Sequence, residues 1–451
     1  MRYSLTIREE EFCRLRETIL DVSHCEGAAY LLCGESRTEQ EIRLLAREVI
    51  PVSTHHYRVR KCDFLSLDSA SYAQVAKRGR LENLSLMFVH SHPGGFLEYS
   101  EQDNREEIKL QEFFQARVPN RIHGSLIVTE NGVIGRIFDN EFRALERIRV
   151  VGQRFAFFDR ERHGVPQPFF ERQVLAFGAE SQALLQQLHV GVVGVGGTGS
   201  AVVEQLARLG VGTLTIFDGD SFDPTNVNRV YGSSPKDVGR AKVEIAKDHI
   251  ERVGLGTTVH VFADPITSEA VAKQLRVCDV IFGCTDKQAP RAILVNLALR
   301  YLIPVLDLGV AINSMNGSIR DIIGRVTILI PGEACLFCRR RITPEVIRLE
   351  GLSEEERRSL AREGYAPELG MPNPAVVPFT TGMACLAITE LLHRLTGFMG
   401  AGRAASEVLC SFDQTRLRTN RPLPDAGCFC AQRSLWGAGD TTPFLDSAWA
   451  T

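Results

Sequence analysis

The chain has 451 residues, of which 44% are hydrophobic and 24% are charged, and its formal net charge at pH 7 is −3. This length exceeds one ordinary core, so we expect a globular protein of two or three domains. The small net charge lacks the strong positive excess typical of nucleic-acid-binding proteins. No apolar run approaches the roughly 18 residues that suggest a membrane span. The N-terminus runs directly into the charged residues 8–11, so we expect no signal peptide and a cytoplasmic protein.

The first motif is a pair of histidines at the end of an apolar segment. Residues 85–89 predict a buried strand, and His90 and His92 project from its end to one side because side chains alternate along a strand. Ser100 then begins a capping-box-like helix start that places Asp103 in the first turn. Two imidazoles and a carboxylate would leave one position of a tetrahedral Zn²⁺ open for water, as in catalytic zinc sites.

Taken together, these residues resemble the JAMM motif of zinc isopeptidases, which remove ubiquitin-like proteins or trim their C-terminal tails. The resemblance implies that His90, His92 and Asp103 bind a catalytic zinc ion. It also implies that Ser100 helps to stabilise the tetrahedral intermediate. Taken singly, each piece has a plainer explanation, since the histidine pair can be incidental and Ser100 can serve only as a helix cap.

The same resemblance requires an upstream glutamate as general base. Glu26 precedes the apolar segment 27–34 and fits this description, although it stands about one residue earlier than the family spacing, a slip that a β-bulge could absorb. The alternative is a solvated turn residue beside a core strand.

A change of architecture follows this first region. Residues 126–129 and 133–138 flank the turn Asn131-Gly132 and predict a hairpin that closes the first domain, whereas residues 159–168 are charged, contain proline and lack periodicity. We therefore predict a domain 1–152, a linker 153–170, a domain 171–432 and a C-terminal tail 433–451.

The second domain begins with a βαβ pattern. Residues 189–193 predict a strand, residues 201–209 an amphipathic helix, and residues 213–217 a second strand that ends at Asp218. The loop between the first strand and the helix carries the glycines Gly194, Gly196, Gly197 and Gly199. Such a loop lets backbone N–H groups approach phosphates, and a later acidic residue can hold a ribose hydroxyl.

Charged residues further along distinguish this pattern from the usual dinucleotide fold. Asp220, Asn226, Arg229, Lys242 and Asp286 bring both cations and carboxylates to the phosphate end, which suits carboxylate attack on a nucleotide phosphate better than hydride transfer. A dinucleotide-dependent oxidoreductase with a metal-binding accessory domain stays open as the alternative.

Residues of roughly 170–430 resemble the ThiF/HesA/MoeB-type adenylyltransferases, the core of ubiquitin-activating enzymes. The resemblance implies ATP and Mg²⁺ as cofactors, with Asp218 on the ribose, Asp220 nearby at the nucleotide, and Asp286 on magnesium. Asn226, Arg229 and Lys242 would contact the phosphates. Arg172 would reach into the ATP site of a second copy, which implies a homodimer.

Cysteines form the third cluster. Cys335 and Cys338 form one close pair and Cys428 and Cys430 a second, which together predict either a structural zinc site or free thiols, since the second pair has an irregular spacing. Residues 339–378 contain no cysteine to carry a thioester or persulfide, and Cys385 lies in an apolar run typical of a core. Most of the twelve cysteines, such as Cys33, Cys278 and Cys410, lie singly in apolar segments, which suits buried thiols in a reducing cytosol.

The combined expectation is an α/β chain with a mixed-sheet, JAMM-like zinc peptidase domain followed by a Rossmann-like, doubly wound adenylyltransferase domain. Its partner would be a ubiquitin-like or sulfur-carrier protein with a glycine-ending tail, with a conjugating enzyme or sulfurtransferase acting next. The sequence leaves open maturation or deconjugation, conjugation or sulfur transfer, and a non-catalytic scaffold role for the first domain.

Overall fold

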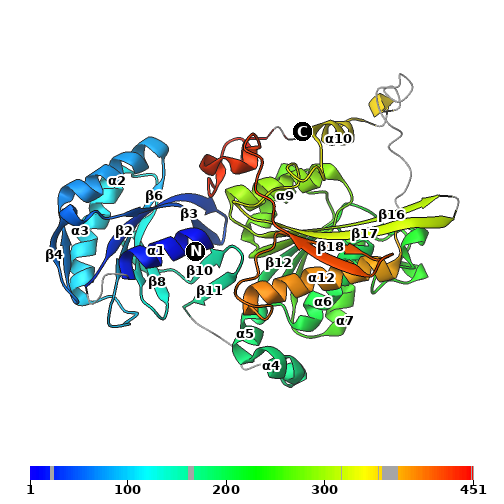
Figure 1. Ribbon diagram of the computed structural model, residues 1–451, viewed down its shortest axis with the longest axis horizontal. Helices are drawn as coiled ribbons and strands as arrows, with labels where there is room; N and C mark the ends of the chain where they lie inside the picture. The colour runs from blue at the N-terminus through cyan, green and yellow to red at the C-terminus, as the bar shows by residue number, and fades with distance from the viewer. Residues whose placement is uncertain are drawn as a thin grey trace. The chain divides into compact units, whose positions relative to one another are not determined.

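The computed structural model describes residues 1–20, 25–160, 167–315, 317–353, 355–357, 374–447 and 449. The chain forms two compact units (Figure 1). The first comprises Met1–Arg162, Arg300–Leu302 and Arg433–Leu445, and the second comprises His163–Leu299, Ile303–Gln432 and Asp446–Thr451. Within the described residues, every helix is too short or too polar to cross a lipid bilayer.

A nine-stranded mixed sheet forms the first unit, in the order β11-β10-β1-β3-β2-β6-β7-β8-β9. Its strands are β1 Arg2–Arg8, β2 Ala28–Arg37, β3 Glu41–Pro51, β6 Ser85–Ser91, β7 His123–Val128, β8 Val133–Asp139, β9 Glu141–Ala144, β10 Arg147–Val151 and β11 Phe155–Asp159. The helices are α1 Glu9–Leu20, α2 Ser69–Glu82 and α3 Glu101–Arg117, and a separate hairpin pairs β4 Tyr57–Arg60 with β5 Leu65–Leu67.

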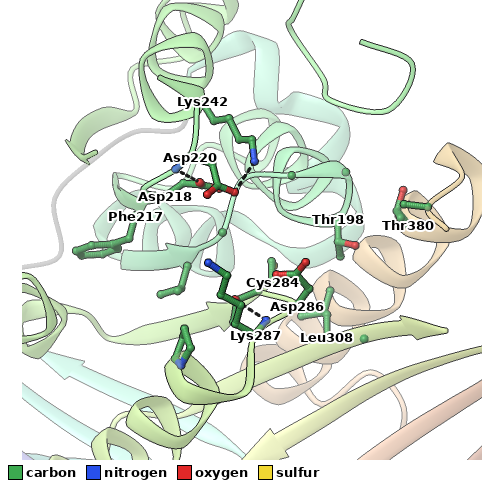
Figure 2. Close-up of a pocket in the computed structure, with 18 of the residues that line it drawn as sticks. Thr198, Phe217, Asp218, Asp220, Lys242, Cys284, Asp286, Lys287, Leu308 and Thr380 are labelled. Carbon is green, nitrogen blue, oxygen red and sulfur yellow. Dashed lines mark hydrogen bonds and ion pairs between the residues drawn. The ribbon is translucent and has the colours of Figure 1, made fainter. Parts of the chain in front are cut away.

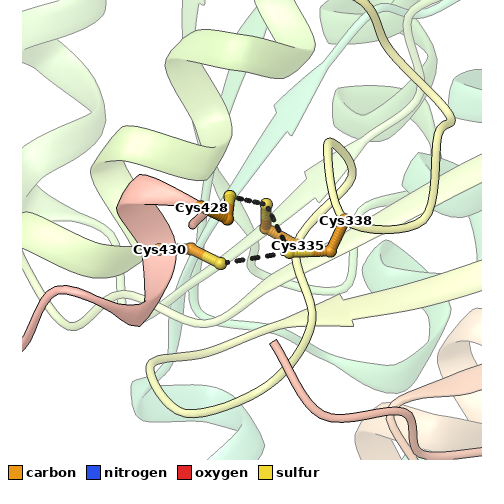
Figure 3. Close-up of side chains that lie close together, drawn as sticks. All are labelled: Cys335, Cys338, Cys428 and Cys430. Carbon is orange, nitrogen blue, oxygen red and sulfur yellow. Dashed lines mark hydrogen bonds between the residues drawn. The ribbon is translucent and has the colours of Figure 1, made fainter. Parts of the chain in front are cut away.

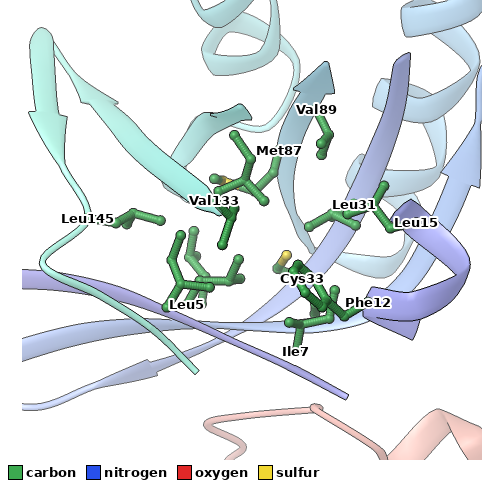
Figure 4. Close-up of a cluster of buried hydrophobic side chains, with 14 of the residues drawn as sticks. Leu5, Ile7, Phe12, Leu15, Leu31, Cys33, Met87, Val89, Val133 and Leu145 are labelled. Carbon is green, nitrogen blue, oxygen red and sulfur yellow. The ribbon is translucent and has the colours of Figure 1, made fainter. Parts of the chain in front are cut away.

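The central strands divide their side chains between two cores. Along β2, Leu31 packs in the core beside α1, whereas Tyr30 packs in the core beside α2 and α3. Strand β6 alternates in the same way, with Met87 facing the α1 core, shown in Figure 4, and Phe88 facing the α2 and α3 core. Because the side-chain period of a strand is two, His90 follows Phe88 onto the face that α3 covers.

The predicted hairpin exists as β7 and β8, which pair antiparallel, but it does not end the first unit. Strand β10 returns to pair parallel with β1, and β11 pairs antiparallel with β10. The first unit therefore extends beyond residue 152, into part of the predicted linker, because β10 pairs with the free edge of β1 and β11 then pairs with the free edge of β10. Residues 161–166 of that linker lie outside the described residues.

The segment predicted as a C-terminal tail contributes contacts to the first unit. The Asp440 backbone N–H donates to the Glu35 carbonyl at 2.8 Å, and the Asp440 carboxylate accepts from the Arg37 N–H at 2.7 Å. Trp436 is buried, with the Arg8 guanidinium 4.7 Å from its ring centroid. Residues 433–445 are thus part of this unit rather than a free appendage.

The second unit is built on an eight-stranded sheet in the order β14-β13-β12-β15-β16-β17-β18-β19. Its strands are β12 His189–Val193, β13 Thr213–Phe217, β14 Thr258–Phe262, β15 Val280–Gly283, β16 Val305–Met315, β17 Ser318–Leu329, β18 Glu407–Ser411 and β19 Arg416–Asn420. Its helices are α4 Glu171–Phe177, α5 Ala179–Gln187, α6 Gly197–Leu209, α7 Lys242–Val253, α8 Glu269–Gln274, α9 Gln288–Arg300, α10 Pro344–Glu350 and α12 Val377–Thr396.

The Rossmann-like expectation holds for half of this sheet. Strands β14, β13, β12, β15 and β16 are parallel neighbours, with α6 and α7 on one face and α9 on the other (Figure 1). Strands β16 to β19 instead pair antiparallel. The doubly wound description therefore applies only to the parallel half, whose carboxyl edge is where such sheets bind nucleotides.

Candidate functional sites

The glycine loop follows β12 and leads into α6. Gly194 has φ +87°, a left-handed backbone conformation that favours glycine, and its N–H donates to the Phe217 carbonyl at 2.7 Å. A Cβ at Gly199 would lie 1.8 Å from the Gly194 carbonyl oxygen, so only glycine permits the helix to start this close to the loop. The loop thus leaves the N-terminal end of α6 open to a ligand.

A pocket of about 420 Å³ opens where β12, β13 and β15 end, and we call it the second-unit pocket (Figure 2). Nearly all predicted nucleotide-binding residues line it, namely Gly194, Gly196, Gly197, Asp218, Asp220, Asn226, Arg229, Lys242 and Asp286. Gly199 lies behind the loop instead. Arg172 is exposed on α4 and does not line the pocket of its own chain. An arginine that reaches the pocket of a second copy would have to be exposed in this way.

Positively and negatively charged side chains both line this pocket. The Lys242 ammonium lies 2.8 Å from the Asp220 carboxylate, and Arg229 donates to the Thr225 carbonyl. Asp218 accepts from the Val195 N–H at 2.7 Å and from the Asp220 N–H at 2.9 Å. Burial raises the pKa of Asp218, while Lys242 opposes that rise. The set can offset triphosphate charge and hold a divalent cation.

Sequence reasoning missed several pocket residues. Lys287 and Arg291 add two cations, and Thr198 and Thr380 add hydroxyl groups. The Arg291 guanidinium lies 3.2 Å from the fully buried carboxylate of Asp307. Lys287 directly follows the predicted Asp286 and could have been predicted from it. Arg291 could not, because its place in the pocket depends on how α9 is oriented.

All four predicted cysteines gather at one point (Figure 3). Cys335 Sγ lies 3.8 Å from Cys338 Sγ and 3.6 Å from Cys428 Sγ, and Cys338 Sγ lies 3.4 Å from Cys430 Sγ. Tetrahedral zinc with Zn–S bonds of about 2.3 Å would set sulfur–sulfur separations of about 3.8 Å. The donor set and its spacing therefore fit zinc.

The cysteines outside this cluster agree with the sequence expectation only in part, because Cys13 and Cys62 are exposed. Cys33, Cys278 and Cys410 are buried. Cys385 was expected in the core but is exposed on α12, because the apolar run surrounds more of the helix than the core covers. The transfer loop considered between residues 339 and 378 lies partly outside the described residues.

In the first unit, β6 and α3 bring the predicted metal ligands together. His90 Nε2 lies 3.1 Å from His92 Nε2 and 3.5 Å from an Asp103 carboxylate oxygen, and His92 Nε2 lies 3.6 Å from the other oxygen. Tetrahedral zinc with bonds of about 2.0–2.1 Å would set edges of about 3.4 Å. These three residues therefore also form a donor set of the right chemistry and size.

The electrostatics of this cluster favour a charged carboxylate. Burial alone would raise the pKa of Asp103, but hydrogen bonds from His90 and His92 reverse this and hold that pKa well below its usual range. Burial likewise acts to lower the pKa of His92, but its bonds to Asp103 and to the Phe96 carbonyl raise it. Asp103 is thus favoured in the charged form, which is the form of a carboxylate that binds a metal ion.

A cavity of about 320 Å³, the first-unit cavity, adjoins the cluster and is lined by Glu26, His90, Ser100, Asp103 and Glu107 among others. Glu26 is buried, and burial raises its pKa to about 7 against the opposing effects of His90 and His92. The β2–β6 register runs unbroken from Ala28 to Cys33, so Glu26 reaches the cavity without a bulge between these two strands. A carboxylate with this pKa suits general base catalysis near neutrality.

Ser100 is committed to the helix cap. Its hydroxyl accepts from the Asp103 N–H at 3.0 Å and donates to the Asp103 carboxylate at 2.7 Å, while the Ser100 N–H donates to the same carboxylate at 2.7 Å. These bonds fix Asp103 and occupy the hydroxyl that was predicted to stabilise an intermediate. In this structure Ser100 orients Asp103, one of the predicted metal ligands.

The glycine loop, the parallel strands and the charged pocket define a nucleotide-binding α/β unit. The family model described as the ThiF family matches residues 170–429 of the chain. The chain belongs to the ThiF family. This match supports an ATP-dependent adenylyltransferase over the dinucleotide oxidoreductase alternative.

Individual relatives cover the chain only in part. It is 35% identical to the tRNA threonylcarbamoyladenosine dehydratase of Haemophilus influenzae over 29% of the chain and 50% of the relative. It is 31% identical to the ubiquitin-like modifier-activating enzyme 5 of Caenorhabditis elegans over 55% of the chain and 58% of the relative. The chain thus spans about half the length of these curated relatives.

One more curated relative and one solved structure complete the comparison. The HesA protein of Leptolyngbya boryana is 27% identical over 51% of the chain and 73% of the relative. The microcin C7 biosynthetic enzyme MccB in complex with N-formylated MccA matches with a TM-score of 0.47 and 16% identity, over 58% of this chain and 75% of that one.

Proposed function

We propose that the second unit adenylates the C-terminal carboxylate of a small ubiquitin-like or sulfur-carrier protein. The observation that carries this proposal is the gathering of the glycine loop, Arg229, Lys242 and Asp286 around one pocket. A carboxylate oxygen attacks the α-phosphorus of ATP, pyrophosphate leaves, and an acyl adenylate forms. Arg229 and Lys242 offset the charge on the phosphates, and Asp286 would hold the Mg²⁺ ion, which neutralises phosphate charge when bound.

The name of one relative, a ubiquitin-like modifier-activating enzyme, favours a protein substrate. The name of another, an adenylyltransferase and sulfurtransferase, favours adenylation coupled to sulfur transfer. A third relative is named for a modified nucleoside of tRNA, which makes a carboxylate carried by tRNA the competing substrate. We propose that the partner's tail ends in glycine and that two copies of this chain act together, with Arg172 directed at the neighbouring pocket.

ATP–pyrophosphate exchange tests the proposal, with a diglycine-ended ubiquitin-like protein and a sulfur carrier as probes. Wild type is expected to exchange with at least one probe, and Lys242→Ala to lose about 10²-fold because a phosphate-facing cation is removed. Lys236→Ala, an exposed lysine outside the pocket, is the matched control. If the wild type binds NAD tightly and shows no ATP–pyrophosphate exchange with either probe, the proposal is wrong.

We propose a second activity for the first unit, zinc-dependent hydrolysis at such a tail by a JAMM-type peptidase. The supporting observation is that His90, His92 and Asp103 place donor atoms within 4.8 Å of one another beside the buried Glu26. Zinc held by these three residues would lower the pKa of a coordinated water to about 7. Glu26 takes the proton of the attacking water and returns it to the amine that leaves when the C–N bond breaks.

Mass spectrometry of a glycine-tailed protein carrying a C-terminal extension tests this second activity. Wild type is expected to trim the extension, His92→Ala to leave it intact, and His55→Ala, an exposed histidine of the same unit, to behave as wild type. Trimming by His92→Ala at the wild-type rate would contradict the proposal. Zinc binding with no cleavage of either extended or isopeptide-linked probes would instead support a scaffold.

A further inference from the structure

The His90 ring lies between two different environments. Its Nε2 atom faces the other metal ligands, whereas its Nδ1 atom lies 3.5 Å from a Glu107 carboxylate oxygen, Oε1. His90 and Glu107 are 2% and 3% exposed. Neither His90 Nδ1 nor Glu107 Oε1 has a hydrogen-bond partner within the described part of the chain. Buried polar atoms are normally hydrogen-bonded. We therefore expect these two atoms to form a hydrogen bond with each other once the His90 ring is held in place.

The other oxygen of Glu107 is firmly held. Oε2 accepts from the Arg136 guanidinium at 2.7 Å and 3.1 Å and from the Ser125 hydroxyl. The guanidinium itself lies between two aromatic rings, 3.5 Å from the Tyr99 centroid and 3.6 Å from the Phe142 centroid. The carboxylate is therefore held in place through one oxygen, with the other oxygen left for His90.

Helix α3 explains why the carboxylate stands in this place. Asp103 and Glu107 are one turn apart on the same face of the helix, so one helix supplies both a metal ligand and a carboxylate behind the ring. The second histidine has an equivalent arrangement, because His92 Nδ1 lies 3.0 Å from the Phe96 carbonyl oxygen. Both rings thus turn Nε2 inward and offer Nδ1 to an acceptor.

We propose that Glu107 is a positioning residue that holds His90 with its proton on Nδ1, so that Nε2 is the donor to the metal. A neutral imidazole carries one N–H, and an acceptor at one nitrogen fixes which nitrogen that is. This inference rests on the proposed zinc site of the first unit and adds a residue that orients it. A purely structural role, as the partner of Arg136, would affect stability without changing zinc affinity.

The test is zinc affinity at the histidine site, measured by chelator competition on the full-length protein with its cysteine cluster intact. His92→Ala identifies which of the two zinc-release steps belongs to this site. Glu107→Gln is expected to weaken zinc binding in that step by about 10- to 100-fold. Glu112→Gln, an exposed glutamate on the same helix, should match wild type. Wild-type affinity in folded Glu107→Gln would overturn the inference.

A second measurement needs no variant and covers the case in which Glu107→Gln fails to fold. Nitrogen NMR of histidine-labelled wild type with zinc is expected to show a slowly exchanging Nδ1–H on His90 and the metal on Nε2. Metal on Nδ1, or a freely exchanging Nδ1–H, would overturn the inference while leaving the peptidase proposal intact. If wild type and His92→Ala take up the same amount of zinc, the zinc site itself is wrong.

Discussion

The Asp220–Lys242 ion pair of the second-unit pocket and the His90–Glu107 pair of the first-unit cavity differ in burial and in the elements that carry them. In the pocket, Asp220 is 65% exposed at its side chain and lies on the loop after β13, where it pairs with Lys242, the first residue of α7. In the cavity, His90 and Glu107 are almost fully buried and lie on a strand and a helix. Buried groups on regular elements are set before a ligand arrives, whereas groups on loops can rearrange around it.

This contrast suits the two proposed reactions. ATP brings its own charge and must enter and leave, so ion pairs such as Lys242 with Asp220 can open at little free-energy cost because they are partly solvated. A metal-dependent hydrolysis needs ligands fixed to within a fraction of an ångström. The comparison therefore predicts that each site can be disabled without disturbing the other.

The largest expected effect is a separation of the two activities by Asp286→Asn. Loss of the carboxylate that would hold Mg²⁺ should reduce ATP–pyrophosphate exchange by about 10³-fold or more, since several kcal/mol of charge stabilisation are removed. Cleavage of an extended tail should stay within about twofold of wild type, because the sites are built independently. Asp248→Asn, exposed on α7, is the control. An equal loss of both activities would show that the two sites depend on each other.

Glu26→Gln should lower tail cleavage by about 10²-fold or more, because an amide cannot accept the proton of the attacking water. Zinc content should not change, since Glu26 is not among the three clustered ligands. Kinetic assays paired with metal analysis check this, with Glu39→Gln on the surface of the same unit as control. Full activity in Glu26→Gln would remove Glu26 from the mechanism.

Glu41 tests whether buried charges stabilise the first unit itself. Burial alone would raise its pKa, but Arg43 and Arg149 overcome that effect and hold the pKa well below its usual range. A lowered carboxyl pKa adds stability that is fully present above the unfolded-state value of about 4.3 and is lost progressively as the pH falls from there through the folded-state pKa. Glu41→Gln should therefore destabilise the unit by roughly 3 kcal/mol at pH 7, because it leaves buried arginines without their anion.

Urea unfolding at pH 7, 4 and 3 measures this effect. The difference in unfolding free energy between wild type and Glu41→Gln should shrink as the pH falls below about 4.3. Protonation of the carboxyl group then removes the free energy that its ionised form contributes to the folded state. A difference that is constant across this range would mean that packing, rather than charge, accounts for the loss.

Local patterns predicted the parts of both sites that depend on a few neighbouring residues. Strands β12 and β13 match their predicted ranges because each is an apolar run ended by glycine or aspartate. The common direction of His90 and His92 follows from alternation alone. Ser100 and Asp103 form the predicted helix start because their capping bonds are local.

Other features depend on contacts between distant segments. Nothing near residues 147–159 indicates that β10 pairs with β1 at the far end of the sequence. Glu107 could be placed one turn after Asp103, but its role needs the orientation of the His90 ring. Cys430 joins the cysteine cluster because the short turn Phe429–Ala431 turns the chain there, which the irregular spacing did not reveal.

The smallest expected effect concerns Asp220, which was predicted to contact the nucleotide. In the structure its carboxylate pairs with Lys242 and is otherwise largely solvent-exposed. Because an exposed ion pair contributes up to about 1 kcal/mol, Asp220→Asn should change the KM for ATP by no more than about fivefold, with an unchanged kcat for exchange. We expect the KM for ATP to fall, because Lys242 no longer has to break its ion pair with Asp220 before it contacts a phosphate. Steady-state exchange kinetics over a range of ATP concentrations check this, and a large fall in kcat would instead assign Asp220 a direct role at the metal or the reacting phosphate.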